Sequence, residues 1–368
     1  MERSDFFRGI KRIVVKIGSS SITESDTISS HKISKFTADV AELKRNGYEV
    51  AIVTSGAISS GAGVLQINRN NISLPEKQAL AAVGQAVLMN EYRKCFEKLG
   101  YNIGQILLTE DDMRNRKRFL NARNAIDALF AMNVIPVINE NDTVTVSEIK
   151  FGDNDTLSAH VFNLIEADLL ILLSDIDGFY NQLDDSEPVY EIFKITDDIR
   201  KKAGGAGTSH GTGGMLTKVN AAEMIMRFGG LMIIADGKEK NILSKIMSGE
   251  KKGTLFAGEK TKINGRKKWI SMRKSRGSII IDDGAVKALV SGKKSLLATG
   301  VVDIIGKFDM GNIVEIADFN NKTIAKGIVN YKSDELLIIK GKKTVEIKNL
   351  LNGHFFDEVV NRDDMIIL

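Results

Sequence analysis

Two segments of the chain combine a lysine with glycines and hydroxyl side chains, the residue types that hold phosphate groups. In the first, Lys16 lies in an apolar run and is followed by Gly18 and three serines. In the second, residues 211–218 read GTGGMLTK, a glycine loop that we expect to open a helix with Lys218 in its first turn. Backbone N–H groups, the helix dipole and an ammonium group would then meet at one phosphate. A Walker loop is excluded because no GxxxxGK[ST] sequence occurs.

Neither segment is specific by itself. A lysine such as Lys16 is costly inside an apolar strand unless it has a charged partner. It is equally compatible with an edge lysine that extends to water. The upstream stretch 204–210, GGAGTSH, suggests a mobile lid over a nucleotide, in which His210 is expected to be a bystander.

Two acidic clusters follow another apolar run. Residues 139–142 read NEND, and residues 151–155 read FGDND. A helix N-cap accounts for one of these carboxylates, Asp153 or Asp155, but not for the rest. A ligand with a cationic group, such as an α-ammonium, or a bound Mg²⁺ ion would account for them.

A third polar segment, Thr54-Ser55-Gly56-Ala57, follows the apolar run 50–53. Small residues that lead into a helix form a pocket for a carboxylate or a phosphate. A tight strand-to-helix turn without a ligand explains the same residues equally well.

Taken together, these segments predict phosphoryl transfer. Lys16 and Lys218 would neutralise the charge that develops on the transferred group. A carboxylate acceptor fits the four histidines of the chain, because it is already ionised at neutral pH and needs no general base. Bringing one anion onto another is then the difficulty, which the lysines and Mg²⁺ relieve.

The elements that must position these residues follow from the apolar periodicity. Short apolar runs alternate with amphipathic stretches, so we predict an α/β fold with an open, mostly parallel sheet covered by helices on both faces. Strands are expected at 13–17, 50–53, 103–108, 134–138, 169–173 and 231–234, and helices at 32–44, 75–99, 119–132, 156–165, 215–228 and 241–247. Ligand sites in such sheets lie beyond the carboxyl ends of the strands, where Ser174 and Asp175 would face the same nucleotide.

Charge and strand pattern divide the chain further. Residues 1–258 have a net charge of −2, residues 259–276 of +7 and residues 277–368 of −1. We therefore expect a catalytic domain, a basic linker and a small mixed β domain with one helix at 284–291. Neither domain is basic enough to indicate nucleic-acid binding by its charge.

The composition of the 368 residues is that of a globular protein, with 43% hydrophobic and 27% charged residues. Cys95 is the single cysteine, so an intrachain disulfide is impossible. No signal peptide is visible at the N-terminus, and no apolar run is long enough to span a bilayer. A cytoplasmic location without membrane association is therefore expected.

Many of the motifs resemble those of the glutamate 5-kinases, a group within the amino-acid kinase family. The resemblance covers nearly the whole chain through VVKIGSSS, IVTSGAISSG, KQALAAVGQ, GQILLT, FLNARNA, PVINENDTV, EIKFGDND, GTGGMLTK, GTLF and RDDMI. It implies that ATP and Mg²⁺ are used to phosphorylate the γ-carboxylate of L-glutamate, the first step of proline biosynthesis. It also implies a homo-oligomer, a dimer or tetramer, with proline as a feedback inhibitor.

The resemblance assigns roles by position. Lys16 and Lys218 would contact the phosphates, and Asp155 would hold both lysines in place. Glutamate would be bound by Ser55, Gly56, Asn139, Asp142 and Asn154. The ATP site would be lined by Lys16, Ser174, Asp175, Thr212, Gly213, Gly214, Met215, Leu216, Thr217 and Lys218.

The C-terminal segment resembles a PUA domain, a module often found in RNA-modifying enzymes. Residues 280–287, IIDDGAVK, carry this resemblance, with glycines 306, 311 and 327 downstream. RNA binding by this domain is not expected, because strong RNA binding requires a basic face. The basic linker with Trp269 would supply one, although a solvated hinge is the simpler interpretation.

Other interpretations keep the fold and change the acceptor to N-acetylglutamate, aspartate, carbamate or a nucleoside monophosphate. The cluster at Asp142 favours a substrate with a free ammonium, which argues against N-acetylglutamate, and a nucleotide acceptor would require basic residues there. An RNA-binding protein with a vestigial kinase domain is a different class of hypothesis. Two costly lysines, Lys16 and Lys218, argue against it.

Overall fold

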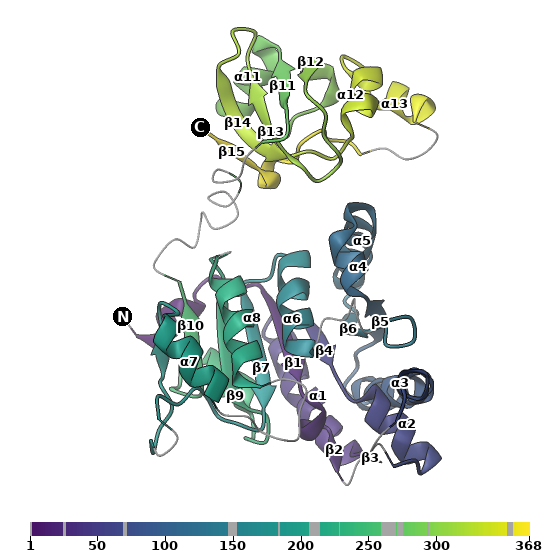
Figure 1. Ribbon diagram of the computed structural model, residues 1–368, viewed down its shortest axis with the longest axis vertical. Coiled ribbons are helices and arrows are strands. Elements are labelled where there is room, and N and C mark those ends of the chain that lie inside the picture. Colours follow the sequence, from purple (N-terminus) through teal and green to yellow (C-terminus); the bar gives the residue numbers. More distant parts are fainter. Residues whose placement is uncertain are drawn as a thin grey trace. The chain divides into compact units, whose positions relative to one another are not determined.

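The computed structural model describes residues 2–24, 27–68, 72–145, 153–182, 185–205, 214–227, 229–258, 270, 275–292, 294–351 and 356–368. The chain divides into two compact units, residues 1–260 and residues 261–368 (Figure 1). Each unit has its own sheet and its own apolar core.

An eight-stranded sheet forms the centre of the first unit, in the order β5-β6-β4-β1-β7-β9-β10-β8. All strands from β5 to β9 in this order run parallel, while β10 is antiparallel to β9. The predicted mostly parallel sheet is therefore confirmed. The strands are β1 (Arg12–Ile17), β4 (Glu49–Thr54), β5 (Ile103–Leu108), β6 (Ile135–Glu140), β7 (Leu169–Ser174), β8 (Glu191–Ile192), β9 (Leu231–Asp236) and β10 (Thr254–Ala257).

Helices cover both faces of this sheet, as expected for apolar strands that are buried on two sides. On one face, α1 (Ser30–Arg45), α3 (Leu74–Glu97) and α9 (Ile242–Met247) pack against alternate strand residues such as Val15 and Ile171. On the other, α5 (Arg116–Ala131), α6 (Asn154–Leu164), α7 (Asp197–Gly205) and α8 (Met215–Arg227) pack against the intervening residues, Val14 and Leu172 among them.

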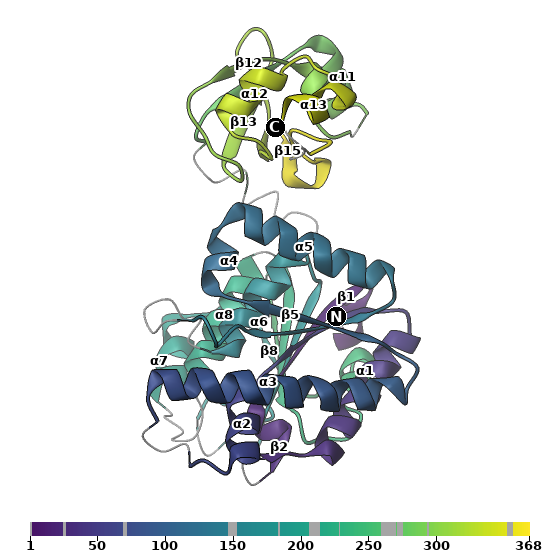
Figure 2. The same ribbon diagram turned by 90° about the vertical axis from the view of Figure 1, so that its right-hand side faces the viewer.

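The predicted long elements agree with the structure to within a few residues. The prediction omitted several short elements, whose few residues do not establish a period. These are the hairpin of β2 (Thr23–Glu24) and β3 (Thr27–Ile28), the strands β8 and β10, and the helices α4 (Glu110–Arg114) and α7. Helix α2 (Ala57–Leu65) follows Gly56 as the small residues indicated, and it lies directly beside α3 (Figure 2).

The second unit contains a five-stranded mixed sheet in the order β12-β11-β13-β14-β15. Its strands are β11 (Ser278–Ile281), β12 (Val301–Ile305), β13 (Ile313–Ala317), β14 (Thr323–Ile328) and β15 (Met365–Ile367). The expectation of one helix was wrong, because α12 (Ser333–Ile339) and α13 (Thr344–Leu350) accompany α11 (Asp283–Val290). Both additional helices have only seven residues, too few for a clear apolar period.

Within the described part of the chain, no helix combines the length and the apolar character that crossing a membrane requires.

Candidate active site

The carboxyl ends of four neighbouring parallel strands bring the predicted residues to one edge of the sheet. Lys16 lies near the end of β1, between Val53 of β4 and Leu172 of β7 in the register. Ser55 follows β4, Asn139 lies at the end of β6 and Ser174 ends β7. Because these strands are adjacent and parallel, residues that are far apart in the sequence meet here.

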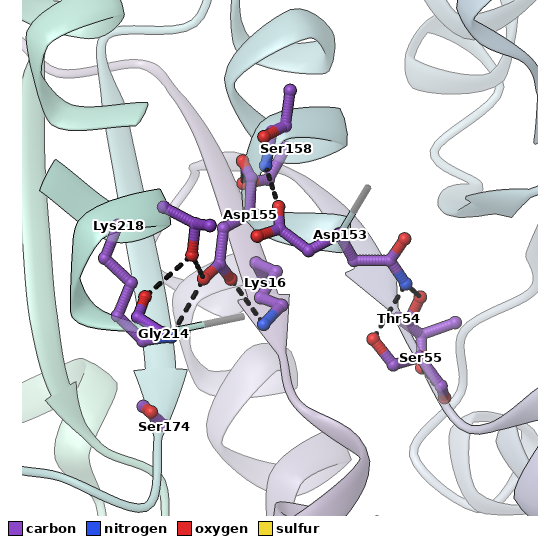
Figure 3. Close-up of polar contacts among 12 residues, drawn as sticks. Lys16, Thr54, Ser55, Asp153, Asp155, Ser158, Ser174, Gly214 and Lys218 are labelled. Carbon is purple, nitrogen blue, oxygen red and sulfur yellow. Dashed lines mark hydrogen bonds and ion pairs between the residues drawn. The ribbon is translucent and has the colours of Figure 1, made fainter. Parts of the chain in front are cut away.

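One buried carboxylate lies between the two lysines (Figure 3). Lys16 Nζ lies 2.5 Å from Asp155 Oδ1, and Lys218 Nζ lies 2.8 Å from Asp155 Oδ2. The exposed fraction is 0% for Asp155, 9% for Lys16 and 5% for Lys218. A strand, the first turn of α6 and the first turn of α8 thus each contribute one charged group to a single cluster.

The charges of this cluster do not cancel. Burial by itself would raise the pKa of Asp155, but the nearby Lys16 and Lys218 outweigh burial and hold that pKa below its usual value. The carboxylate therefore remains ionised at neutral pH, and two ammonium groups share one negative charge. An excess of one positive charge remains to attract an anionic ligand.

The start of α6 explains how Asp155 reaches this place. Asp153 is the N-cap residue, and its carboxylate accepts a hydrogen bond from the backbone N–H of Thr156 at 2.8 Å. The cap orients the first turn, so that Asp155 points to the lysines (Figure 3). Asn154 forms hydrogen bonds with Thr54 and Ser55 at the end of β4. Of the two predicted candidates for the helix cap, Asp153 and Asp155, Asp153 fills this role.

Side-chain amides form a second cluster beside the charged one. Asn154 Nδ2 lies 2.7 Å from Thr54 O, 2.7 Å from Ser55 Oγ and 3.2 Å from Asn139 Oδ1. No described residue donates a hydrogen bond to Asn154 Oδ1. The carbonyl end of this amide is therefore available to a ligand donor.

Gly56 makes the turn from β4 into α2. Its φ of 102° lies in the left-handed region that favours glycine, and a β-carbon there would lie 3.2 Å from Ile22 Cδ1. Asp142, the remaining residue of the predicted glutamate site, follows β6 and is half-buried.

Comparisons with known proteins show the family of the chain. Residues 11–236 match the model of the Amino acid kinase family, and residues 277–351 match that of the PUA domain. A glutamate 5-kinase from Caldanaerobacter subterraneus subsp. tengcongensis is 46% identical over 363 residues, which is 97% of this chain and 98% of that one. This chain belongs to the amino acid kinase family. A second relative, the glutamate 5-kinase of Geobacter sulfurreducens, is 44% identical, with 100% of both chains covered.

As a member of the amino acid kinase family, the chain is an enzyme of the phosphotransferase class. The solved structure of carbamate kinase from Giardia lamblia bound to AMP-PNP has a TM-score of 0.51 to this chain. It is 15% identical and covers 68% of this chain and 99% of its own, so it shows the common fold alone.

Several residues of the predicted nucleotide site lie in the part of the chain that the structure describes. Ser174 is buried, and its hydroxyl donates to Asp175 Oδ1 at 3.0 Å, while Asp175 itself is exposed. Thr217 Oγ1 lies 2.7 Å from Gly214 O and 3.4 Å from Asp155 Oδ2. Gly214 and Met215 are half-buried and Leu216 is exposed, whereas Thr212, Gly213 and His210 lie outside the described residues.

Two residues of α3 contact the amide cluster without having been predicted to do so. Gln85 Oε1 lies 2.9 Å from Asn139 Nδ2, and Tyr92 Oη lies 2.9 Å from Thr54 Oγ1. Both belong to a long helix whose apolar spacing predicts packing only. The polar Gln85 on a largely buried side of α3 was the one available signal.

Proposed function

We propose that this enzyme transfers the γ-phosphoryl group of ATP to the side-chain carboxylate of L-glutamate, the first step of proline biosynthesis. The observation that carries the proposal is the pair Lys16 and Lys218 on one buried carboxylate, beside an amide cluster suited to an amino acid. The curated relatives, which match over nearly their whole length, are named glutamate 5-kinases.

The reaction joins two anions. A γ-carboxylate oxygen of glutamate forms a bond to the γ-phosphorus in line with the breaking bond to the β–γ bridging oxygen, and ADP leaves with the electron pair of that bond. The products are glutamyl 5-phosphate and ADP. The acceptor carboxylate carries no proton at neutral pH, so no residue has to remove one. The enzyme has to position the two substrates and neutralise their negative charge.

Lys16 and Lys218 would supply the neutralisation. In the transition state negative charge spreads over the transferred group, and two preorganised ammonium groups stabilise it more strongly than they stabilise the separated substrates. Asp155 would hold both ammonium groups in place. The single negative charge of Asp155 is shared by two ammonium groups, so the cluster keeps a net positive charge that attracts phosphate.

The amide cluster would hold the acceptor. The available Asn154 Oδ1 is an acceptor for the α-ammonium of glutamate, and Asp142 would add a negative charge nearby. Ser55 and Gly56 lie immediately before α2 and would offer hydrogen bonds to a carboxylate. Asn139 contacts Asn154 and would complete this binding site for the acceptor.

The nucleotide would lie on the side of Ser174, Asp175 and the segment from Thr212 to Lys218, with Lys16 at the phosphates. Among the described residues no three Asp, Glu, His or Cys side chains converge into a metal cluster. A Mg²⁺ ion would arrive with ATP, because Mg²⁺ in kinases is held mainly by phosphate oxygens and waters. Such an ion would reduce the negative charge of the phosphates.

We further propose that residues 1–258 contain all the chemistry and that residues 259–276 link them to the PUA domain. A homo-oligomer, inhibition by proline and a cytoplasmic location remain predictions. Activity of a chain that lacks residues 277–368 would support the division. An inactive but folded truncation would show that the second unit completes the site.

Turnover of ATP with a panel of acceptors tests the proposed reaction. Hydroxylamine traps an acyl phosphate as a hydroxamate, which we expect with L-glutamate but not with N-acetylglutamate, aspartate, carbamate or UMP. Hydroxamate or phosphorylated product from another acceptor, with none from glutamate, would contradict the assignment of the amide cluster.

A further inference from the structure

Helix α3 is anchored to the strand end that begins the acceptor pocket. A β-carbon at Gly84 would lie 1.8 Å from the carbonyl oxygen of Ala57, so the helix packs directly on the first residue of α2. Two turns beyond the neighbouring Gln85, the buried Tyr92 forms a hydrogen bond of 2.9 Å with the hydroxyl of Thr54. Helix α3 therefore lies in a fixed position relative to the turn that carries Ser55.

From this fixed position, Gln85 reaches the next strand end. Its Oε1 accepts a hydrogen bond of 2.9 Å from Asn139 Nδ2. Asn139 Oδ1 in turn accepts from the backbone N–H of Glu140 at 2.9 Å and lies 3.2 Å from Asn154 Nδ2. Three side-chain amides from α3, β6 and α6 thus form one continuous chain that ends at Ser55 Oγ.

We propose that Gln85 is a positioning residue of the acceptor site, which acts through Asn139 to keep the carbonyl of Asn154 turned toward the substrate. The proposal rests on the proposed function, in which Asn154 Oδ1 receives the α-ammonium of an amino-acid acceptor. Gln85 itself is not assigned a contact with the substrate.

The order of donors and acceptors along the chain supports this role. Asn139 has an exposed fraction of 2%, so its Nδ2 requires a protein acceptor, and Gln85 Oε1 provides one. If the Asn139 amide were reversed, its NH₂ group would face the backbone N–H of Glu140 and the NH₂ group of Asn154. Two donors would then face a third donor, which is unfavourable. Each amide therefore has only one orientation that satisfies its neighbours.

The oxygen and the nitrogen of the Gln85 amide differ in their contacts. Its Nε2 is buried and has no hydrogen-bond partner among the described residues, whereas its Oε1 is engaged. A buried donor without an acceptor is unfavourable. The side chain nevertheless keeps its oxygen on Asn139, because the reverse orientation would oppose two NH₂ groups.

Loss of the Gln85 oxygen should weaken acceptor binding specifically. Without it, Asn139 Nδ2 is left buried and unpaired, and rotation of Asn139 to find another partner removes its oxygen from Asn154. Asn154 then keeps its hydrogen bonds to Thr54 and Ser55 but loses its third contact, so its carbonyl points less reliably to the α-ammonium. Lys16 and Lys218 form no hydrogen bond with these amides in the contacts described above, so ATP binding should be unaffected.

The test is steady-state kinetics of the full-length enzyme with Gln85→Met, which keeps the length of the side chain and removes both polar atoms. We expect KM for glutamate to rise about fivefold to tenfold, as for the loss of one hydrogen bond, while KM for ATP stays within about twofold. Asn90→Met, an amide replacement on the exposed side of the same helix, is the matched control and should leave both constants unchanged.

A double-mutant cycle separates positioning from a general loss of structure. If Gln85 acts through Asn139, Gln85→Met in an Asn139→Ala background should change KM for glutamate by less than about twofold. Independent, multiplying effects would overturn the proposal, as would an equal rise in KM for ATP. If Gln85→Met does not fold, Gln85→Asn, whose shorter side chain withdraws the oxygen, replaces it in the same cycle.

The assay of the wild-type enzyme distinguishes a failure of the proposed function from a failure of the proposed role of Gln85. Absence of hydroxamate from glutamate with the unmodified enzyme would remove the proposed function, and the role of Gln85 with it. Normal activity of the wild type together with an unchanged KM in Gln85→Met would remove the role of Gln85 alone.

Discussion

Lys16 and Lys218 lie on opposite oxygens of the same carboxylate, at 2.5 Å from Oδ1 and 2.8 Å from Oδ2 of Asp155. This arrangement holds two like charges close together in a buried place. It is stable only because Asp155 lies between them, and it leaves an excess positive charge at the edge of the sheet. The first predictions follow from this relationship.

Asp155→Asn should lower turnover at least about 100-fold, because the two ammonium groups lose the group that fixes them. It should also reduce the free energy of unfolding by about 3–5 kcal/mol, because two buried charges are left without a counter-ion. Steady-state kinetics and urea unfolding measure both effects. Asp153→Asn, which keeps an oxygen for the helix cap, is the matched control and should behave like the wild type. Turnover near the wild-type value in Asp155→Asn would contradict the role of the carboxylate.

Lys218→Ala should lower kcat by about 100-fold to 1000-fold with KM for glutamate changed by less than about threefold. The interaction with the transferred group grows in the transition state, so its loss affects turnover more than binding. Lys201→Ala, at an exposed position of α7, provides the comparison. An effect of Lys218→Ala confined to KM would exclude the phosphate role.

Asp142→Ala should raise KM for glutamate by about tenfold or more, while KM for ATP and kcat change little. The expected loss is that of a charged partner for the α-ammonium. Removal of an exposed carboxylate elsewhere, as in Asp111→Ala, should have no such effect. A glutamate KM equal to that of the wild type would show that Asp142 does not face the ammonium.

Asp39→Asn should stabilise the protein at neutral pH. Burial raises the pKa of Asp39 to about 6, so the folded state binds this proton more tightly than the unfolded chain does. Stability is therefore lost as the pH rises from about 4 to above 6, and the ionised carboxylate is a net cost at pH 7.5. The asparagine should gain about 1–3 kcal/mol there and nothing at pH 3.5. Thermal unfolding as a function of pH measures this, and a gain that does not depend on pH would refute the explanation.

Gly84→Ala should destabilise the protein by about 3 kcal/mol or more, because the new methyl group would lie 1.8 Å from the backbone oxygen of Ala57. Helices α2 and α3 would have to separate, and KM for glutamate should rise as the Ser55 turn moves. Gly204→Ala is the comparison, because a β-carbon there would meet no atom of the described residues within 4 Å. It should leave the melting temperature unchanged or raise it slightly. A stable, fully active Gly84→Ala variant would contradict the proposed rigid contact.

Local pattern in the sequence was sufficient for the main elements of the fold. The buried strand that contains Lys16 and the helix that begins near Met215 follow from apolar spacing and glycine position, which depend on neighbouring residues only. The short elements at 191–192, 333–339 and 344–350 were omitted because an element of two to seven residues does not establish an apolar period. The parallel order of the strands then implied that polar residues from different loops meet at one edge.

The sequence by itself therefore determined the α/β architecture, the edge of the sheet where the candidate site lies and the residue types gathered there. Only the tertiary structure decided which atoms face one another. Gln85 and Asn139 are 54 positions apart, and Asn154 and Ser55 are 99 apart, yet hydrogen bonds join both pairs. A side-chain amide takes its orientation from whatever donors and acceptors surround it, and those neighbours come from other elements of the fold. The position of Gln85 in α3 indicates a polar group on a half-buried side of the helix, but not that its partner is Asn139.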